Sequence, residues 1–265
     1  MEIFKRPLCP MQPACPVSEL LRRQVAPAPF SEAPNAGNPL WDIYAKNTDK
    51  SIHKWHHYFN IYHKHFQRYI GKKVNILEIG VNYGGSLPMW QKYFGKDANI
   101  FGIDIEPRCK EYERDGLKIF IGDQSDRNFM RSVMEQIPKI DILIDDGGHT
   151  TLQQINSFLE CYDKIADDGV YLVEDLHTNY WPNYIDSCET FMDFAKKHVD
   201  YLNSWFFCGE RETFMRYFSI HGAQAGEPGI EQVSQFTAIT HSVTFYNSVC
   251  VFEKTPVIAP YSERR

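Results

Sequence analysis

Short apolar runs alternate with helical patterns through the middle of this chain. Each run has the length of a buried strand, and each helical pattern is long enough to carry the chain back to the start of the next strand. Such crossovers place successive strands parallel in one sheet, with helices on both faces. The chain is therefore predicted to fold as a doubly wound, Rossmann-like α/β domain. The predicted strands are 74–79, 100–105, 117–121, 140–144 and 170–173, and the predicted helices are 86–94, 126–136, 151–166 and 186–199.

Two further segments extend this core at its ends. Residues 239–246 and 249–252 flank Asn247-Ser248, a pattern that predicts an antiparallel hairpin at the sheet edge. The hairpin brings the mostly parallel sheet to seven strands. Upstream, aromatic and aliphatic residues recur at helical spacing, which predicts an amphipathic helix over 51–70. Its histidines are interpreted as a polar helix face, because no glutamate lies between the pair spaced four residues apart.

The first forty residues differ from the rest in composition. They hold more than half of the fifteen prolines and show little apolar periodicity. This predicts an irregular N-terminal arm over 1–40, followed by one domain over 41–265 with a helical cap at its start.

Bulk composition limits the partners and the compartment. A net charge of −6 gives no support for nucleic acid or an anionic membrane as a partner. No apolar stretch approaches the roughly 20 residues that a bilayer-spanning helix needs. The cysteines are odd in number, scattered and without metal-type spacing, which predicts reduced thiols and a cytoplasmic protein.

A glycine-rich loop follows the first predicted strand. Gly80 and Gly84-Gly85 let a ligand approach the backbone where the next helix offers free N–H groups. The spacing is G-x-x-x-G-G rather than G-x-G-x-x-G, which argues against a nicotinamide cofactor. Asp104 ends the second strand, where an acid can bind ribose hydroxyls, and Asp123-Gln124 follow the third, beside the expected adenine. The three positions together predict a bound adenosine cofactor.

Two acidic clusters follow the fourth and fifth predicted strands. Asp145-Asp146 precede His149, and Glu174-Asp175 precede His177. The spacing between them holds one helix and one strand, so both clusters are expected at the same edge of the sheet. Oxygen-rich sites of this kind suit a hard divalent cation such as Mg²⁺. A metal-assisted enzyme is the leading hypothesis.

These motifs resemble a known family. The segments E-I-G-x-x-x-G-G-S, G-I-D-I, G-D-Q, I-D-D-G-x-H and V-E-D-L-H-T are similar to those of class I S-adenosylmethionine-dependent methyltransferases. More narrowly, they resemble the metal-dependent macrolide and rhamnosyl sugar O-methyltransferases, over about residues 45–255. The resemblance implies S-adenosylmethionine as methyl donor, a hydroxyl of a sugar or glycosylated natural product as acceptor, and a dimer or tetramer.

The resemblance also implies roles for individual residues. Asp146, Glu174 and Asp175 would hold Mg²⁺ or Mn²⁺, and His149 would be the general base. The cofactor-binding set would be Glu78, Gly80, Tyr83, Gly84, Ser86, Asp104, Asp123, Gln124 and Asp145.

Several single-residue alternatives stay open. Asp145 is a loop cap or a cofactor contact, and Asp175 is a metal ligand or a helix N-cap. His177 is a second base, a substrate contact or a structural residue, with substrate contact slightly favoured. Tyr180 and Trp181 line the acceptor pocket or pack in the core.

Two other functions compete with methyl transfer. A non-haem iron hydroxylase would use His149, His177 and Asp146 as its two-histidine, one-carboxylate set. It has no need of the series Glu78, Asp104 and Asp123. A non-catalytic module that only binds S-adenosylmethionine would not need the metal carboxylates, so it ranks last.

Overall fold

The computed structural model describes residue 26 and residues 35–206 and 234–258. The chain divides between Pro34 and Asn35, and every element below belongs to the unit Asn35–Arg265. The predicted arm over 1–40 lies largely outside the described residues.

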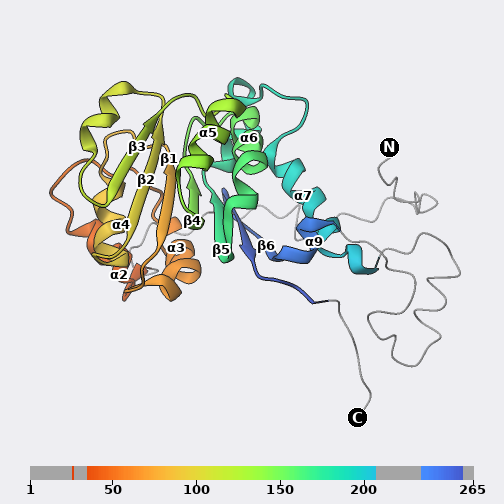
Figure 1. Ribbon diagram of the computed structural model, residues 1–265, viewed down its shortest axis with the longest axis horizontal. Coiled ribbons are helices and arrows are strands. Elements are labelled where there is room, and N and C mark those ends of the chain that lie inside the picture. The colour runs from red at the N-terminus through yellow and green to blue at the C-terminus, as the bar shows by residue number, and fades with distance from the viewer. Residues whose placement is uncertain (1–25, 27–34, 207–233, 259–265) are drawn as a thin grey trace, which may run out of the picture. The chain divides into compact units, whose positions relative to one another are not determined.

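A seven-stranded sheet forms the centre of this unit, in the order β3-β2-β1-β4-β5-β7-β6 (Figure 1). The first five strands are parallel, and β7 pairs antiparallel with both β5 and β6. This confirms the predicted doubly wound sheet with an antiparallel hairpin. The strands are β1 (Asn75–Ile79), β2 (Asn99–Asp104), β3 (Leu117–Ile121), β4 (Ile140–Asp145), β5 (Ile165–Val173), β6 (Thr240–Tyr246) and β7 (Val249–Lys254).

Helices cover both faces of the sheet and divide its apolar residues into two cores (Figure 1). On one face lie α2 (Pro39–Ala45), α3 (Tyr58–Phe66) and α4 (Ser86–Phe94). On the other lie α5 (Arg127–Gln136), α6 (Thr151–Cys161) and α7 (Phe191–Leu202). The remaining elements are short: α9 (Gln235–Ile239) and the 3₁₀ segments η2 (Gln67–Tyr69), η3 (Pro107–Tyr112), η4 (Tyr162–Lys164), η5 (Leu176–Tyr180), η6 (Pro182–Tyr184) and η7 (Ser204–Phe206). Within the described residues, no helix has both the length and the apolar character that a bilayer crossing requires.

The helix predicted over 51–70 is wrong in its first third. Residues 51–57 form no helix, and α3 begins only at Tyr58. Tertiary contacts override the local periodicity, because the Lys54 side chain is buried in the acidic edge of the sheet. We call residues 51–57 the N-terminal strap.

Three other boundaries differ from the prediction. The helix expected over 151–166 ends at Cys161, since β5 already begins at Ile165. The strand expected over 170–173 is correspondingly longer. The helix expected from 186 begins at Phe191, where the Thr190 side chain accepts a hydrogen bond from the Asp193 N–H and caps the helix.

Strand register decides which acidic side chains share a face. Glu78 of β1 pairs with Ile144 of β4, and Asp145 of β4 pairs with Val173 of β5. Side chains alternate between faces along a strand, so residues two apart point the same way. Glu78, Asp146 and Glu174 therefore point toward the face covered by α3 and α4, and Asp145 points toward the α5 and α6 face.

Candidate active site

A cavity opens at the carboxyl ends of β1, β2 and β4, where ligands bind in open α/β sheets. Its wall includes the N-terminal strap, the glycine loop and both acidic loops. Six of the nine predicted cofactor residues line it: Gly80, Tyr83, Ser86, Asp104, Asp123 and Gln124.

A glycine is required at position 80 because the loops that follow β1 and β4 pass close to each other. Its φ of +95° lies in the region that favours glycine. A Cβ there would sit 1.9 Å from the carbonyl oxygen of Asp146. The glycine thus lets the first strand–helix loop pass directly against the first acidic loop.

Asp104, the predicted ribose acid, holds the shape of the glycine loop. Its Oδ2 accepts the N–H groups of Val81 and Asn82 at 2.8 and 2.7 Å. Its Oδ1 accepts the Glu106 N–H at 2.8 Å. A carboxylate offers about four acceptor positions, so capacity remains for a hydroxyl in the cavity.

Glu78 and Gly84 were predicted to bind the cofactor, but neither lines the cavity. Glu78 is fully buried and accepts hydrogen bonds from the Ser86 hydroxyl at 2.6 Å and the Trp90 indole at 3.2 Å. Gly84 has a φ of +71°, and the Tyr112 ring packs where its Cβ would be. Both residues support the glycine loop from behind.

Asp145 does not line the cavity either, because its side chain faces the opposite core. It accepts a hydrogen bond from the Gln124 amide at 2.6 Å. The same Gln124 accepts the Gly148 N–H at 3.1 Å and so ties two strand-end loops together. Burial raises the pKa of Asp145 to about 7, although the hydrogen bond from Gln124 opposes this rise. Asp145 is a support for the loop, one of its two predicted roles.

Asp146, His149 and Asp175 form the outer cluster. Each offers one ligand atom, and these atoms lie within 4.8 Å of one another. His149 Nε2 is 3.6 Å from Asp175 Oδ2 and 3.9 Å from Asp146 Oδ1. His149 Nδ1 is buried and has no hydrogen-bond partner among the described residues. Two carboxylates and an imidazole at this spacing fit a divalent cation.

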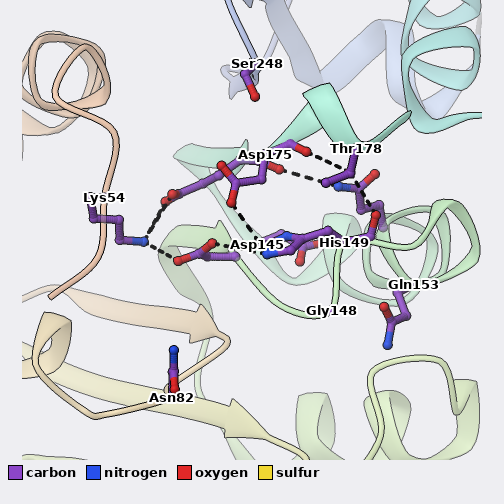
Figure 2. A network of polar contacts seen from close by, with 12 residues as sticks. Lys54, Asn82, Asp145, Gly148, His149, Gln153, Asp175, Thr178 and Ser248 are labelled. Atoms are coloured by element: carbon purple, nitrogen blue, oxygen red, sulfur yellow. Dashed lines mark hydrogen bonds and ion pairs between the residues drawn. The ribbon is translucent and has the colours of Figure 1, made fainter. Parts of the chain in front are cut away.

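Backbone strain positions two members of the outer cluster. His149 and Asp175 adopt φ values of +62° and +54°, which side-chain-bearing residues rarely adopt. The Thr178 hydroxyl lies 2.8 Å from the Asp175 carbonyl and 3.0 Å from the His149 carbonyl, so its one proton lies within reach of either oxygen (Figure 2). The Tyr58 hydroxyl donates to Asp175 Oδ1 at 2.8 Å. One buried threonine thereby links the two acidic loops.

Glu174, the third predicted metal ligand, has a different neighbour. Its carboxylate is buried, and its two oxygens accept hydrogen bonds of 3.0 and 3.1 Å from the Lys54 ammonium. Lys54 also contacts Asp146 Oδ2 at 2.5 Å and lies 3.5 Å from Glu78 Oε1. We call Lys54, Glu78, Glu174 and Asp146 Oδ2 the inner cluster.

The inner cluster carries more negative than positive groups. Burial lowers the pKa of Lys54, but the carboxylates of Asp146, Glu174 and Glu78 outweigh it and raise that pKa well above its ordinary value. Burial and the charge of Asp146 raise the pKa of Glu174, against the attraction of Lys54. One ammonium faces three carboxylates, so the site as a whole favours a further cation.

His177 lies at the edge of the outer cluster, with its Nδ1 3.9 Å from Asp175 Oδ1. Its Nδ1 is 2.7 Å from the Ser248 hydroxyl, and its ring meets Trp55 and Trp181 edge to face. It does not join the group of ligand atoms formed by the described residues. The iron-hydroxylase set, which needs His177 beside His149 and Asp146, is therefore not favoured.

Tyr180 and Trp181 do not line the cavity, but they are not core residues. Their exposed fractions are 70% and 50%, and Trp55 is 51% exposed. Trp55 and Trp181 stand around His177 beside the second acidic loop, where an acceptor could contact them.

Sequence reasoning missed the residues that come from outside the strand ends. Lys54, Tyr58, Thr178 and Ser248 all contact the acidic loops. A signal for one of them was present: the shared face of Glu78, Asp146 and Glu174 requires a buried cation among the residues that cover it.

No family model matches the chain. Among curated proteins it is 35% identical over 163 residues to the 8-demethyl-8-α-L-rhamnosyl tetracenomycin-C 2′-O-methyltransferase of Streptomyces olivaceus, which covers 57% of this chain and 43% of that protein. It is 33% identical over 141 residues to the demethylmacrocin O-methyltransferase of Streptomyces fradiae, covering 49% and 35%. The matched part of this chain therefore spans less than half the length of these relatives.

The fold is also that of a solved methyltransferase. The MycE methyltransferase of the mycinamycin biosynthetic pathway, in complex with Mg, SAH and mycinamycin VI, superposes with a TM-score of 0.67 at 23% identity. The likeness covers 82% of this chain and 53% of that one. The resemblance to class I methyltransferases, and among them to macrolide and rhamnosyl sugar O-methyltransferases, is thus confirmed.

Proposed function

We propose that this chain is an S-adenosylmethionine-dependent, Mg²⁺-assisted O-methyltransferase that acts on a hydroxyl of a sugar or glycosylated metabolite. The observation that carries the proposal is the outer cluster, which opens into the same cavity as the glycine loop. An adenosine-type pocket beside a hard-cation site is the combination that metal-assisted methyl transfer needs. The curated relatives are sugar O-methyltransferases, which supports the same reaction.

Different residues of the cofactor pocket would contact different parts of the cofactor. Gly80 brings the backbone after β1 to the cavity, and Ser86 begins α4, where helix N–H groups are free to face a ligand. Asp104 keeps acceptor capacity for ribose hydroxyls, and Asp123 and Gln124 lie at the next strand end. Bound there, S-adenosylmethionine would supply an electrophilic methyl group.

The outer cluster handles the acceptor hydroxyl. A sugar hydroxyl is a weak acid, and a divalent cation held by Asp146 and Asp175 would lower its pKa by several units. The predicted third ligand, Glu174, is the partner of Lys54 in the structure. The His149 imidazole stands beside both outer carboxylates, so it can accept the released proton.

The acceptor would lie where His149, Asp175 and the exposed aromatic side chains meet. Trp55 and Trp181 offer ring faces, and sugars stack their C–H faces on such rings in a partly dry site. A glycosylated small molecule is the partner proposed here. Assembly into a dimer or tetramer is a further expectation, which light scattering would measure.

The direct test is methyl transfer to candidate rhamnosides and fucosides. The protein, S-adenosylmethionine, Mg²⁺ and each acceptor are incubated together, and the product is followed by mass. We expect the mass of one methyl group to be added, the gain to vanish in EDTA, and excess Mg²⁺ to restore it.

A matched pair of variants makes the test specific. Asp175→Asn removes a carboxylate of the outer cluster, whereas Asp97→Asn removes an exposed carboxylate outside it. We expect the first to lower turnover at limiting Mg²⁺ by about tenfold or more and the second to leave it unchanged. Full turnover in EDTA would rule out the metal role.

A further inference from the structure

Lys54 reaches the acidic edge from a segment far away in the sequence. Its ammonium contacts Asp146, 92 residues away, and Glu174, 120 residues away. Its side chain is 3% exposed, and the carboxylate of Glu174 is 1% exposed. A cation buried this deeply between carboxylates is a built part of the site, unlike a surface ion pair.

The contacts divide the oxygen atoms of the edge into two sets. Lys54 takes both oxygens of Glu174 and the Oδ2 of Asp146. Asp146 Oδ1, Asp175 Oδ2 and His149 Nε2 face one another on the other side. Only this second set meets the spacing that one metal ion needs among the described residues.

The N-terminal strap that carries Lys54 also covers the cofactor cavity. Ser51, His53 and Lys54 are among its lining residues. The strap passes so close to the glycine loop that a Cβ on Gly85 would lie 2.3 Å from the Ser51 carbonyl oxygen. The strap has no helical or strand hydrogen bonding of its own. Lys54 ties it to the ends of β4 and β5, and His57 Nε2 lies 3.1 Å from the Asn247 carbonyl oxygen.

We propose that Lys54 is a positioning residue, a tethered cation that occupies the inner cluster in place of a second metal contact and pins the N-terminal strap over the cofactor. The proposal rests on the proposed function and deepens it. The divalent cation is then confined to Asp146 Oδ1 and Asp175, beside the His149 ring, and Glu174 serves as the counter-ion of Lys54.

Lys54→Met tests both halves of the proposal through binding rather than turnover. Removal of the ammonium takes a repelling charge from beside the divalent site and frees two carboxylates. We expect Mn²⁺ to bind at least about tenfold more tightly, measured by electron paramagnetic resonance of the free ion. S-adenosylhomocysteine, measured by calorimetry, should bind more weakly, because the strap loses its ion pairs with the strand ends beside the cavity.

Two controls separate this from general damage. Lys54→Arg keeps the charge and should restore both affinities toward those of the unmodified protein. Lys50→Met removes a charge just before the strap, where Lys50 lies over the Tyr112 ring, and should shift Mn²⁺ affinity by less than about twofold. A protein that was merely destabilised would lose both ligands together, so opposite shifts identify the positioning role.

Glu174→Gln provides an independent check. It should weaken Mn²⁺ binding far less than Asp175→Asn does, and an equal loss in both variants would overturn the proposal. Weaker Mn²⁺ binding in Lys54→Met would overturn it as well. If the unmodified protein binds no Mn²⁺ at all, the proposed function fails instead, so the two failures are distinguishable.

Discussion

Two loops, each with an acidic pair followed by a histidine, come after neighbouring strands, yet their acidic side chains have different partners. After β4 the pair is Asp145-Asp146, and after β5 it is Glu174-Asp175. Asp145 pairs in register with Val173, so the second acidic pair is displaced by one residue relative to the first. The buried member of each pair therefore faces a different core, one toward a neutral amide and the other toward an ammonium.

The histidines of the two loops differ in the same way. His149 lies within 4 Å of two carboxylates, with one ring nitrogen lacking any partner among the described residues. His177 has its ring nitrogen taken by the Ser248 hydroxyl. The sequence motif is shared, so the partners from distant parts of the chain assign the roles.

Replacing each histidine in turn tests most directly whether the two loops have different roles. His149→Ala should lower the turnover number for methyl transfer by about 10²–10⁴-fold, the usual contribution of a general base. His177→Ala should lower it by less than about tenfold, since it only orients and contacts. Turnover is measured by mass at saturating Mg²⁺, with S-adenosylhomocysteine affinity as the control for folding. Equal losses would make the two loops equivalent.

The buried acids can be compared through pH and stability. Burial raises the pKa of Asp145 to about 7 in the folded state, above its ordinary value near 3.9 in the unfolded chain. The stabilising contribution of its bound proton is complete at low pH and is lost as pH rises through 7. Asp145→Asn cannot titrate, so its advantage in unfolding free energy over the unmodified protein should grow by about 2 kcal/mol from pH 5 to pH 8.

Urea denaturation in the presence of EDTA measures this difference at each pH. Glu174 titrates in both proteins, so its contribution cancels. A difference that stays constant with pH would mean that Asp145 is ionised in the folded state throughout, as an ion-paired carboxylate would be.

A smaller effect is expected at the residue that links the loops. Thr178→Val removes the hydroxyl that lies against the carbonyls of His149 and Asp175 without changing the volume much. A buried carbonyl left without its donor costs about 1–2 kcal/mol of unfolding free energy. Thr255→Val, at an exposed threonine whose hydroxyl donates to its neighbour's carbonyl, is the matched control and should change stability by less than about 0.5 kcal/mol.

The fold was predictable because its signals are local. Apolar runs and their spacing located all seven strands, and the turn at Asn247-Ser248 located the hairpin. The strap was predicted as helix because its aromatic residues do recur at helical spacing. The ion pairs of Lys54 with buried carboxylates stabilise the non-helical strap more than the first turns of a helix would.

The residues of the candidate site also differ in how far local sequence patterns predict them. Residues directly after strands, such as Gly80, Asp123 and Asp146, line the cavity as the parallel sheet requires. Lys54 and Tyr58 belong to none of the motifs, and Tyr58 reaches Ser248 across 190 residues of sequence. Contacts of that separation depend on how the whole sheet is assembled, which no local pattern encodes.

The turn between β6 and β7 has a consequence for the order in which the molecule is completed. The Ser248 hydroxyl lies within hydrogen-bond distance of His177 and Tyr58, and the Asn247 carbonyl oxygen lies within hydrogen-bond distance of His57. A growing chain that has reached only residue 239 already contains every predicted cofactor and metal residue. It lacks the groups that hold His177 and Tyr58 in place, so during synthesis the binding cavity can form before the acceptor side is finished.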